Sequence, residues 1–358
     1  MNNISINVNT ATFVGIDAHP TEHTAVAMNR FEDSKGKLRF PNTLAGIAEF
    51  LSWLPTIEKQ PQNTVIGIEG RGTSGNAIVS SLLNTYEHVY EVNPLYTKQR
   101  RTFGTRGKKS DPIDAKLIAE VVTKKVSELP KITKDEVSTD MLSLKRVVWF
   151  YEEITIQGSR IKNQLHNLQR EKELSVTQEE KANVSFILKA KHRELERIQK
   201  TQQSLKIKLV TLLPHAEKNL MTFPGVSIVL ASALVANTNG IHRFATRDKY
   251  LQYAGIGLLE RSSGKKHRFV QSNKGNRMLN RVFYLVALYH ITRHQESKAY
   301  YEKKLKEGKT KKHAMRCVMK RVACIIYSMM KSGEDYRGMM GKKKLKNIKR
   351  LRVLAGLT

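Results

Sequence analysis

The chain has 358 residues, with 62 Lys and Arg against 32 Asp and Glu, a net charge of +30 at pH 7 and an isoelectric point near 10.0. Its hydrophobic content of 40% is enough to bury a core, which excludes a wholly disordered basic protein. The absence of a long apolar run excludes a membrane-spanning helix, and two cysteines exclude a disulfide framework or a four-cysteine zinc site. We expect Cys317 and Cys324 to be reduced thiols in a cytoplasmic protein without a secretory signal.

The positive charge is concentrated toward the end of the chain. Residues 1–100 have a net charge of −1, whereas residues 213–358 carry 31 basic against 8 acidic residues, a net charge of +23. Such a field attracts polyanions, of which nucleic acid is the commonest. An anionic membrane surface is the alternative, but it would require a basic amphipathic helix with exposed bulky apolar residues, which the sequence does not indicate.

The first third of the chain reads as alternating strands and helices. Strands are expected over residues 13–16, 24–28, 38–40, 64–68 and 88–92. Helices are expected over residues 43–55, 73–83 and 110–126, with Pro55 stopping the first of them. This order favours a mixed α/β sheet with helices on its faces.

The remainder is predicted to be mostly helical. Residues 136–212 have few helix breakers and fit two helices of a coiled-coil arm, with a turn near 172–184. In the compact segment that follows, Pro224-Gly225 before an apolar helix indicates a helix-hairpin-helix or an ordinary turn. The rest reads as a Lys-rich helical tail. The expected domains are therefore 1–130, 131–212, 213–300 and 301–358.

Four carboxylates stand at the ends of expected elements in the first domain. Asp17 and Glu69 each follow a strand, and Asp111 and Asp114 are three residues apart at the start of a helix, which places them on one face. Converging acids repel one another, but hard divalent cations such as Mg²⁺ or Mn²⁺ take carboxylate oxygens as ligands, and two such ions can clamp a scissile phosphate. Alternatively, Asp17 caps a turn and the other pair complements the helix dipole.

Several stretches resemble one family in the expected order. VGIDAHPTEHTAVAMN and GIEGRGTSGNAI resemble the first aspartate and glutamate motifs of the DEDD transposases of the insertion sequence 110 family. NPLYTKQRRTFGTRGKKSDPIDAKLIAE resembles that module's basic loop and D-P-x-D-A stretch. MTFPGVSIVLASALVAN and the segment containing RSSGKKHRF resemble the second transposase domain. The resemblance covers roughly residues 12–126 and 215–295.

The resemblance implies an RNase H-like (RuvC-like) first domain, a coiled-coil arm and a helical transposase domain. It matches Asp17, Glu69, Asp111 and Asp114 to the family's four catalytic, metal-binding acids, and Ser263 to its nucleophilic serine, with Ser262 as the fallback. The chain has Ser272-Asn273 where a Thr or Ser usually precedes the family's Lys-Gly-Asn. Without the resemblance, residues 261–268 read more simply as a turn with a basic patch.

Basic residues around these motifs are candidates for nucleic-acid contact, because Arg and Lys donate to phosphates. They are Arg100, Arg101, Arg106, Lys108, Lys109, Arg261, Lys265, Lys266, Arg268, Lys274 and Arg277.

The sequence hypothesis is a transposase or recombinase that cuts and rejoins donor and target DNA through Mg²⁺-dependent serine attack. The resemblance further implies a structured non-coding guide RNA, a homo-oligomer from dimer to tetramer, and a bacterial, nucleoid-associated location. Low aromatic content, 7%, suits backbone contact better than base stacking. Two alternatives remain: a metal-dependent junction resolvase or nuclease in which water attacks, and a non-catalytic RNA- or DNA-binding scaffold.

Overall fold

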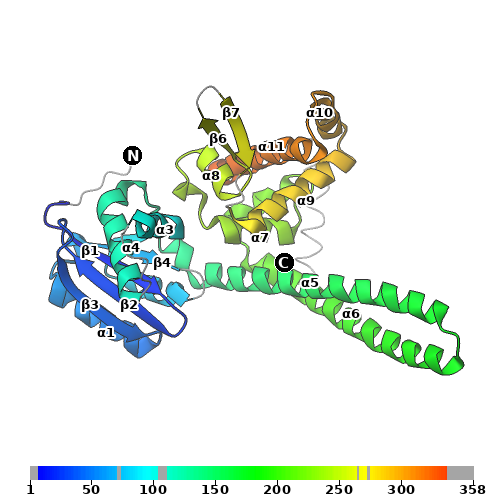
Figure 1. The fold of residues 1–358 in the computed structure, drawn as a ribbon, viewed down its shortest axis with the longest axis horizontal. Coiled ribbons are helices and arrows are strands. Elements are labelled where there is room, and N and C mark those ends of the chain that lie inside the picture. Colours follow the sequence, from blue (N-terminus) through cyan, green and yellow to red (C-terminus); the bar gives the residue numbers. More distant parts are fainter. Residues whose placement is uncertain (1–6, 71–73, 104–110, 264–265, 272–274, 337–358) are drawn as a thin grey trace. The chain divides into compact units, whose positions relative to one another are not determined.

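The chain folds into two compact units, Met1–Ser138 and Thr139–Thr358 (Figure 1). This computed structural model describes residues 7–70, 74–103, 111–263, 266–271 and 275–336. The boundary between the units follows Ser138, and the four segments expected from the sequence stay predictions. In the stretches that are described, no helix is both long enough and apolar enough to cross a membrane.

The first unit is built on a five-stranded mixed sheet of order β3-β2-β1-β4-β5. Its strands are β1 Thr12–Ala18, β2 Glu22–Met28, β3 Ser34–Pro41, β4 Thr64–Glu69 and β5 His88–Glu91. The pairs β1–β2 and β2–β3 are antiparallel, and β1–β4 and β4–β5 are parallel. Its helices are α1 Leu44–Ile57, α2 Asn76–Leu82, α3 Pro94–Phe103 and α4 Asp111–Lys125. This order of strands and helices confirms the predicted mixed α/β sheet and is consistent with an RNase H-like fold.

Alternation along the strands gives the sheet two buried faces. Val14 and Ile16 of β1 pack with α1 and α2, whereas Phe13 packs with α4 on the opposite face. Because successive side chains of a strand point to opposite faces, Gly15 and Asp17 share the α4 face with Phe13. The position of α4 therefore decides what surrounds Asp17.

The prediction that Pro55 ends the first helix was wrong, since α1 continues to Ile57. The helix starts at the N-cap Thr43, whose side chain accepts a hydrogen bond from the Gly46 amide. Pro55 lies in the last turn and removes one amide donor there, while Glu58 still donates its amide to the Leu54 carbonyl. A proline so close to a helix end removes too little hydrogen bonding to stop the helix.

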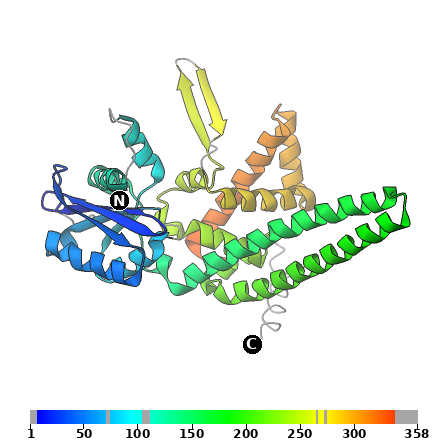
Figure 2. The ribbon, with the colours of Figure 1, turned by 60° about the horizontal axis from the view of Figure 1, so that its bottom comes forward.

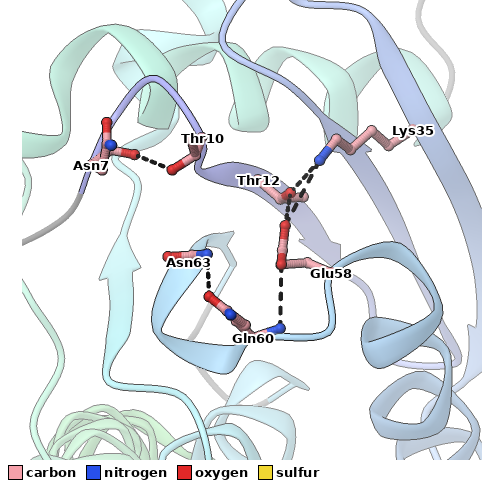
Figure 3. Close-up of polar contacts among 7 residues, drawn as sticks. All are labelled: Asn7, Thr10, Thr12, Lys35, Glu58, Gln60 and Asn63. Carbon is pink, nitrogen blue, oxygen red and sulfur yellow. Dashed lines mark hydrogen bonds and ion pairs between the residues drawn. The ribbon is translucent and has the colours of Figure 1, made fainter.

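A polar network joins β1, β3 and the end of α1 at the amino end of β1 (Figure 3). Lys35 Nζ donates to Thr12 Oγ1 at 2.7 Å, and Thr12 Oγ1 donates to Glu58 Oε2 at 3.1 Å. Lys35 Nζ also lies 3.9 Å from Glu58 Oε2, and the Gln60 amide donates to Glu58 Oε1 at 3.2 Å. The start of β1 is thus tied to two other elements.

The second unit begins with a long helical hairpin, visible in Figures 1 and 2. Its helices are α5 Thr139–Leu174 and α6 Gln178–Leu212, and the turn between them falls within the predicted range. Thr177 caps α6 in a capping box with Glu180, each side chain accepting from the other residue's backbone amide. The helices pack on each other within one chain, so a hairpin is confirmed and a coiled-coil repeat stays a prediction.

The rest of the second unit is a helical core with a two-stranded hairpin. The elements are η5 His215–Thr222, α7 Ile228–Thr238, α8 Arg247–Tyr253, β6 Leu258–Ser263, β7 Lys266–Gln271, α9 Arg277–Arg293, α10 Gln295–Lys306 and α11 Lys311–Ser332. Figure 2 shows β6 and β7 as a separate ribbon beside the helices of this unit.

The expected basic tail over 301–358 needs correction for its first half. Val322 and Ile326 of α11 are buried in the core of the second unit, together with Phe283 of α9 and Tyr250 of α8. The prediction of helix was correct, but α11 is amphipathic and its apolar side is part of the core. Residues 337–358, including the GKKKLKNIKRLR run, lie outside the described residues.

Candidate acidic site on the α4 face of the sheet

Two glycines allow α4 to lie directly on the sheet. Gly15 of β1 and Gly67 of β4 are partners in the parallel register. A Cβ atom at Gly15 would lie 2.2 Å from the Ala115 carbonyl oxygen, and one at Gly67 would lie 2.1 Å from a methyl group of Val122. Only glycine leaves this space, so the sequence of these strands sets the height of α4 above the sheet.

This close packing brings the first turn of α4 toward the carboxyl ends of β1 and β4. Asp111 begins α4, and Asp114 in the same turn is 9% exposed. Asp17 pairs directly with Glu69 across β1 and β4. Directly paired residues share a face of the sheet, so both strand acids lie on the face that α4 covers.

The register extends this row of residues across two more strands. Asp17 is opposite Thr24 of β2, and Thr24 is opposite Arg39 of β3. Arg39, Thr24, Asp17 and Glu69 therefore form one row on the α4 face. All residues of this row except Thr24 have ionisable side chains, and α4 supplies two further carboxylates beside it.

The pKa of Asp17 is sensitive to the other three acids. Burial, followed by the negative charges of Asp114, Glu69 and Asp111 in that order, raises the pKa of Asp17 from 3.8 to about 6. His19 acts in the opposite direction and lowers it. Asp114, Glu69 and Asp111 therefore all lie close enough to Asp17 to influence its ionisation.

Glu69 and Asp111 are each held by another side chain. The Thr97 hydroxyl of α3, 2% exposed, donates to Glu69 Oε2 at 2.6 Å. Arg39 Nη2 donates to Asp111 Oδ2 at 2.9 Å, and Arg39 Nε lies 3.0 Å from Glu22 Oε2. These contacts draw Glu69 toward α3 and Asp111 toward β3.

The donor set suits a hard divalent cation, since four carboxylates supply only oxygen ligands. Among the residues that the structure describes, however, no three His, Cys, Asp or Glu side chains are gathered closely enough to hold a metal ion. Like charges repel one another, and Glu69 and Asp111 instead contact Thr97 and Arg39. A cation would have to draw these carboxylates together.

The predicted serine lies in the other unit, at the end of β6. Ser263 pairs with Lys266, and Ser262 pairs with His267, across the β6–β7 hairpin. Gly264 and Lys265 at its tip lie outside the described residues. The register places both candidate serines within two residues of the tip.

The predicted basic residues fall into three groups. Arg100 of α3 forms a 2.8 Å ion pair with Glu120 of α4, with side chains 22% and 17% exposed, so its contact supports the packing of the two helices. Lys266, Arg261 and Arg268 lie in the β6–β7 hairpin, where Arg261 pairs with Arg268, and Arg277 is exposed at the start of α9. The side chain of Arg101 and residues Arg106, Lys108, Lys109, Lys265 and Lys274 lie outside the described residues.

Sequence reasoning missed the partners of the acids, chiefly Arg39 and Thr97. The signal for Arg39 was the alternation in SKGKLRF, which puts Lys35, Lys37 and Arg39 on the side opposite Leu38 and Phe40. No local pattern marked Thr97, because its contact with Glu69 spans 28 residues and depends on the position of α3.

Comparison with known proteins gives two family matches and a related protein. Residues 14–171 match a DEDD family model described as "Transposase", and residues 217–302 match the "Transposase IS116/IS110/IS902 family". The chain is also 29% identical over 124 residues to "Insertion element IS900 uncharacterized 42 kDa protein" of Mycobacterium paratuberculosis. That match covers 34% of this chain and 31% of the relative. The first family match contains all four acids, and the second contains the β6–β7 hairpin.

Proposed function

Because the chain belongs to the IS110 family of transposases, we propose that it cuts and rejoins DNA strands for the movement of an insertion sequence. The observation that carries the proposal is the meeting of Asp17, Glu69, Asp111 and Asp114 on one face of the sheet. Carboxylates placed this close together repel one another, which packing alone does not repay. A divalent cation bound between them would offset this repulsion.

Asp17, Glu69, Asp111 and Asp114 would hold Mg²⁺ or Mn²⁺, and a bound cation would stabilise negative charge on a scissile phosphate. The chain's own contribution is positional. β1 and β4 hold Asp17 and Glu69 in register, α4 supplies the other two acids, and Thr97 orients Glu69. Partial burial of the site also strengthens the electrostatic attraction between the carboxylates and a cation.

Ser263 is proposed as the nucleophile, on the strength of the resemblance of the RSSGKKHRF segment to the family. Its hydroxyl would lose a proton, its Oγ would bond to phosphorus, and one phosphorus–oxygen bond to a sugar would break, releasing a strand with a hydroxyl end. Attack of another strand's hydroxyl on the phosphoserine would restore the serine and join the strands. The energy of the phosphodiester bond is conserved in the phosphoserine link, so the reaction needs no nucleoside triphosphate.

The resemblance also supports a structured guide RNA as a partner and a dimer or tetramer as the active form. The charge of +23 on residues 213–358 supports contact with phosphate backbones. The α5–α6 hairpin is the proposed dimerising element, with exposed apolar side chains such as Phe186, 76% exposed, available for a second copy.

One test addresses the covalent step. The protein is incubated with RNA, Mg²⁺ and labelled DNA, and a denaturing gel is examined for a protein–DNA adduct. Ser263→Ala is expected to abolish the adduct and strand joining, with Ser262→Ala as the matched neighbour. Intact joining by Ser263→Ala, with its loss in Ser262→Ala, would move the nucleophile to Ser262.

A metal-dependent nuclease is the second candidate, because the four acids all lie in one unit and need no serine for attack by water. It predicts DNA cleavage without any adduct and unchanged cleavage by Ser263→Ala. Full activity of both Asp17→Ala and Asp114→Ala would exclude these acids as the catalytic site, and an absence of cleavage by the wild-type protein would favour a nucleic-acid-binding scaffold.

A further inference from the structure

Arg39 lies beside the acidic site, on the exposed part of strand β3, where its side chain is not needed for packing. It lies in the row Arg39–Thr24–Asp17–Glu69 on the α4 face, and its side chain is 58% exposed. Its guanidinium bridges two carboxylates, with Nη2 at 2.9 Å from Asp111 Oδ2 and Nε at 3.0 Å from Glu22 Oε2. The positively charged guanidinium of Arg39 thus lies at the edge of the acidic site.

The contact of Arg39 with Asp111 is weak enough to be exchanged. Both side chains are more than half exposed, 58% and 59%, so water screens their attraction. A divalent cation among four carboxylates would interact with all of them at short range and would be less exposed. Asp111 therefore has a stronger partner available whenever such a cation is present.

We propose that Arg39 is a placeholder that holds Asp111 until a divalent cation takes it, and that the released guanidinium then binds a nucleic-acid phosphate. The inference deepens the proposed function and rests on its claim that the four acids hold a cation. Arg39 acts here as a positioning residue before the cation binds and as a phosphate-binding residue afterwards.

Glu22 explains why the released side chain would stay at the site. Its carboxylate lies 3.0 Å from Nε of Arg39, a different nitrogen from the Nη2 that donates to Asp111. When Asp111 leaves, both terminal nitrogens of Arg39 become available on a side chain that Glu22 still orients. The planar fork of arginine matches the spacing of two phosphate oxygens, which a lysine cannot reproduce.

The exchange couples cation binding to nucleic-acid binding. Each ligand favours the broken Arg39–Asp111 pair, the cation by binding Asp111 and the phosphate by binding Arg39. Each therefore increases the affinity of the other by the same factor.

The first measurement is binding of Mn²⁺ alone to the full chain, followed by the electron paramagnetic resonance signal of free Mn²⁺. Arg39→Gln is expected to bind Mn²⁺ about two- to five-fold more tightly, because Asp111 no longer has a competitor. Lys37→Gln is the matched control: it removes the same charge from the same strand and face, and within the described chain Lys37 forms no ion pair. An unchanged or weaker Mn²⁺ affinity in Arg39→Gln, or an equal gain in Lys37→Gln, would overturn the inference.

The second measurement is binding of a fluorescent DNA duplex, and separately of a single-stranded RNA, at several salt concentrations. With Ca²⁺ present to occupy the acids, Arg39→Gln should reduce the slope of log affinity against log salt concentration by about one for one of these nucleic acids. Without Ca²⁺, Arg39→Gln should leave this slope unchanged. Arg39→Lys should keep the charge but bind more weakly than wild type. A slope that does not change in Ca²⁺, or that falls equally without it, would contradict the exchange.

Two variants separate this inference from the proposed function. Asp17→Asn and Asp114→Asn should each weaken Mn²⁺ binding. If neither does, the proposed cation site is wrong, and the Arg39 inference fails with it. If both weaken Mn²⁺ binding but Arg39→Gln leaves it unchanged, only the inference about Arg39 is wrong. Circular dichroism and thermal unfolding of each variant confirm that the unit is folded.

Discussion

Gly15 and Gly67 are direct partners on the parallel strands β1 and β4, and a Cβ atom on either residue would overlap α4. This pair explains why Asp111 and Asp114, far away in the sequence, arrive beside Asp17 and Glu69. The acidic site is therefore as much a product of two absent side chains as of four present ones.

Gly15→Ala is expected to lower the free energy of unfolding by about 1–3 kcal/mol, because the new methyl group meets the backbone of α4 and not a movable side chain. Strand cleavage should fall as well, since Asp111 and Asp114 move with the helix. Denaturant unfolding measures the first effect. Gly36→Ala is the control: its Cβ would lie 2.8 Å from the end of the Ile57 side chain, which can rotate away. Equal losses in both variants would show that the contact with α4 is not special.

Asp17 should make stability depend on pH in the metal-free protein. Burial and the neighbouring Asp114, Glu69 and Asp111 raise its pKa from 3.8 to about 6 in the folded state. Between about pH 4 and pH 6 the folded state holds a proton that the unfolded state has released, so stability falls as the pH rises through this window.

Asp17→Asn removes this loss and should be more stable than wild type at pH 7.5, by about 1 kcal/mol after allowance for solvent screening of a partly exposed group. The two proteins should have equal stability below pH 4. Thermal unfolding across the pH range checks this, with the exposed Glu49→Gln as the control. A stability advantage of Asp17→Asn that persists at pH 3.5 would point to a cause other than ionisation.

Thr97 should matter through its hydroxyl. Thr97→Val keeps the buried shape but leaves Glu69 Oε2 without its 2.6 Å donor, so cleavage is expected to fall about tenfold, as for other residues that orient metal ligands. Thr97→Ser retains the donor and should stay within about two-fold of wild type. Initial cleavage rates at saturating Mg²⁺ distinguish the two. If Thr97→Val matches Thr97→Ser, the hydrogen bond does not orient Glu69 for the reaction.

Ile325 and Ile326 of α11 give a direct test of where the core ends. Ile326 is 0% exposed and Ile325 is 36% exposed. Ile326→Ala should cost about 2–4 kcal/mol by leaving a cavity, whereas Ile325→Ala should cost less than about 1 kcal/mol. Denaturant unfolding monitored in the second unit measures both. Similar small losses would mean that α11 contributes little to the core and behaves as the tail that the sequence first indicated.

Local patterns predicted most elements of the first unit, but not helix α3. Apolar and β-branched runs located all five strands, and Asp17 and Glu69 were recognised at strand ends. What local patterns could not provide was register. Whether Asp17 lies opposite Glu69 or one residue away depends on pairing between distant strands, and a shift of one residue would place the carboxylate on the other face.

The role of basic residues was harder to predict than that of acids. Arg39 and Arg100 have the same charge and similar settings in the sequence, yet one contacts Asp111 and the other is paired with Glu120 between two helices. Long flexible side chains take whichever partner the packing brings near, and that packing is not local. For the second unit, the amphipathic pattern of residues 311–332 was masked by its lysines, which gave an impression of a solvated tail.

The polar network at Thr12 gives β1 two ends of opposite character. At one end Lys35, Thr12 and Glu58 fasten the strand to its neighbours (Figure 3). At the other end Asp17 lies near three like charges. Spontaneous opening of the strand should therefore begin at Asp17 and stop near Thr12, so amide hydrogens exchange fastest at the acidic end. A ligand that neutralises the acids should stabilise this end of β1. Its binding would then be detected as slower exchange of the amide hydrogens of the strand.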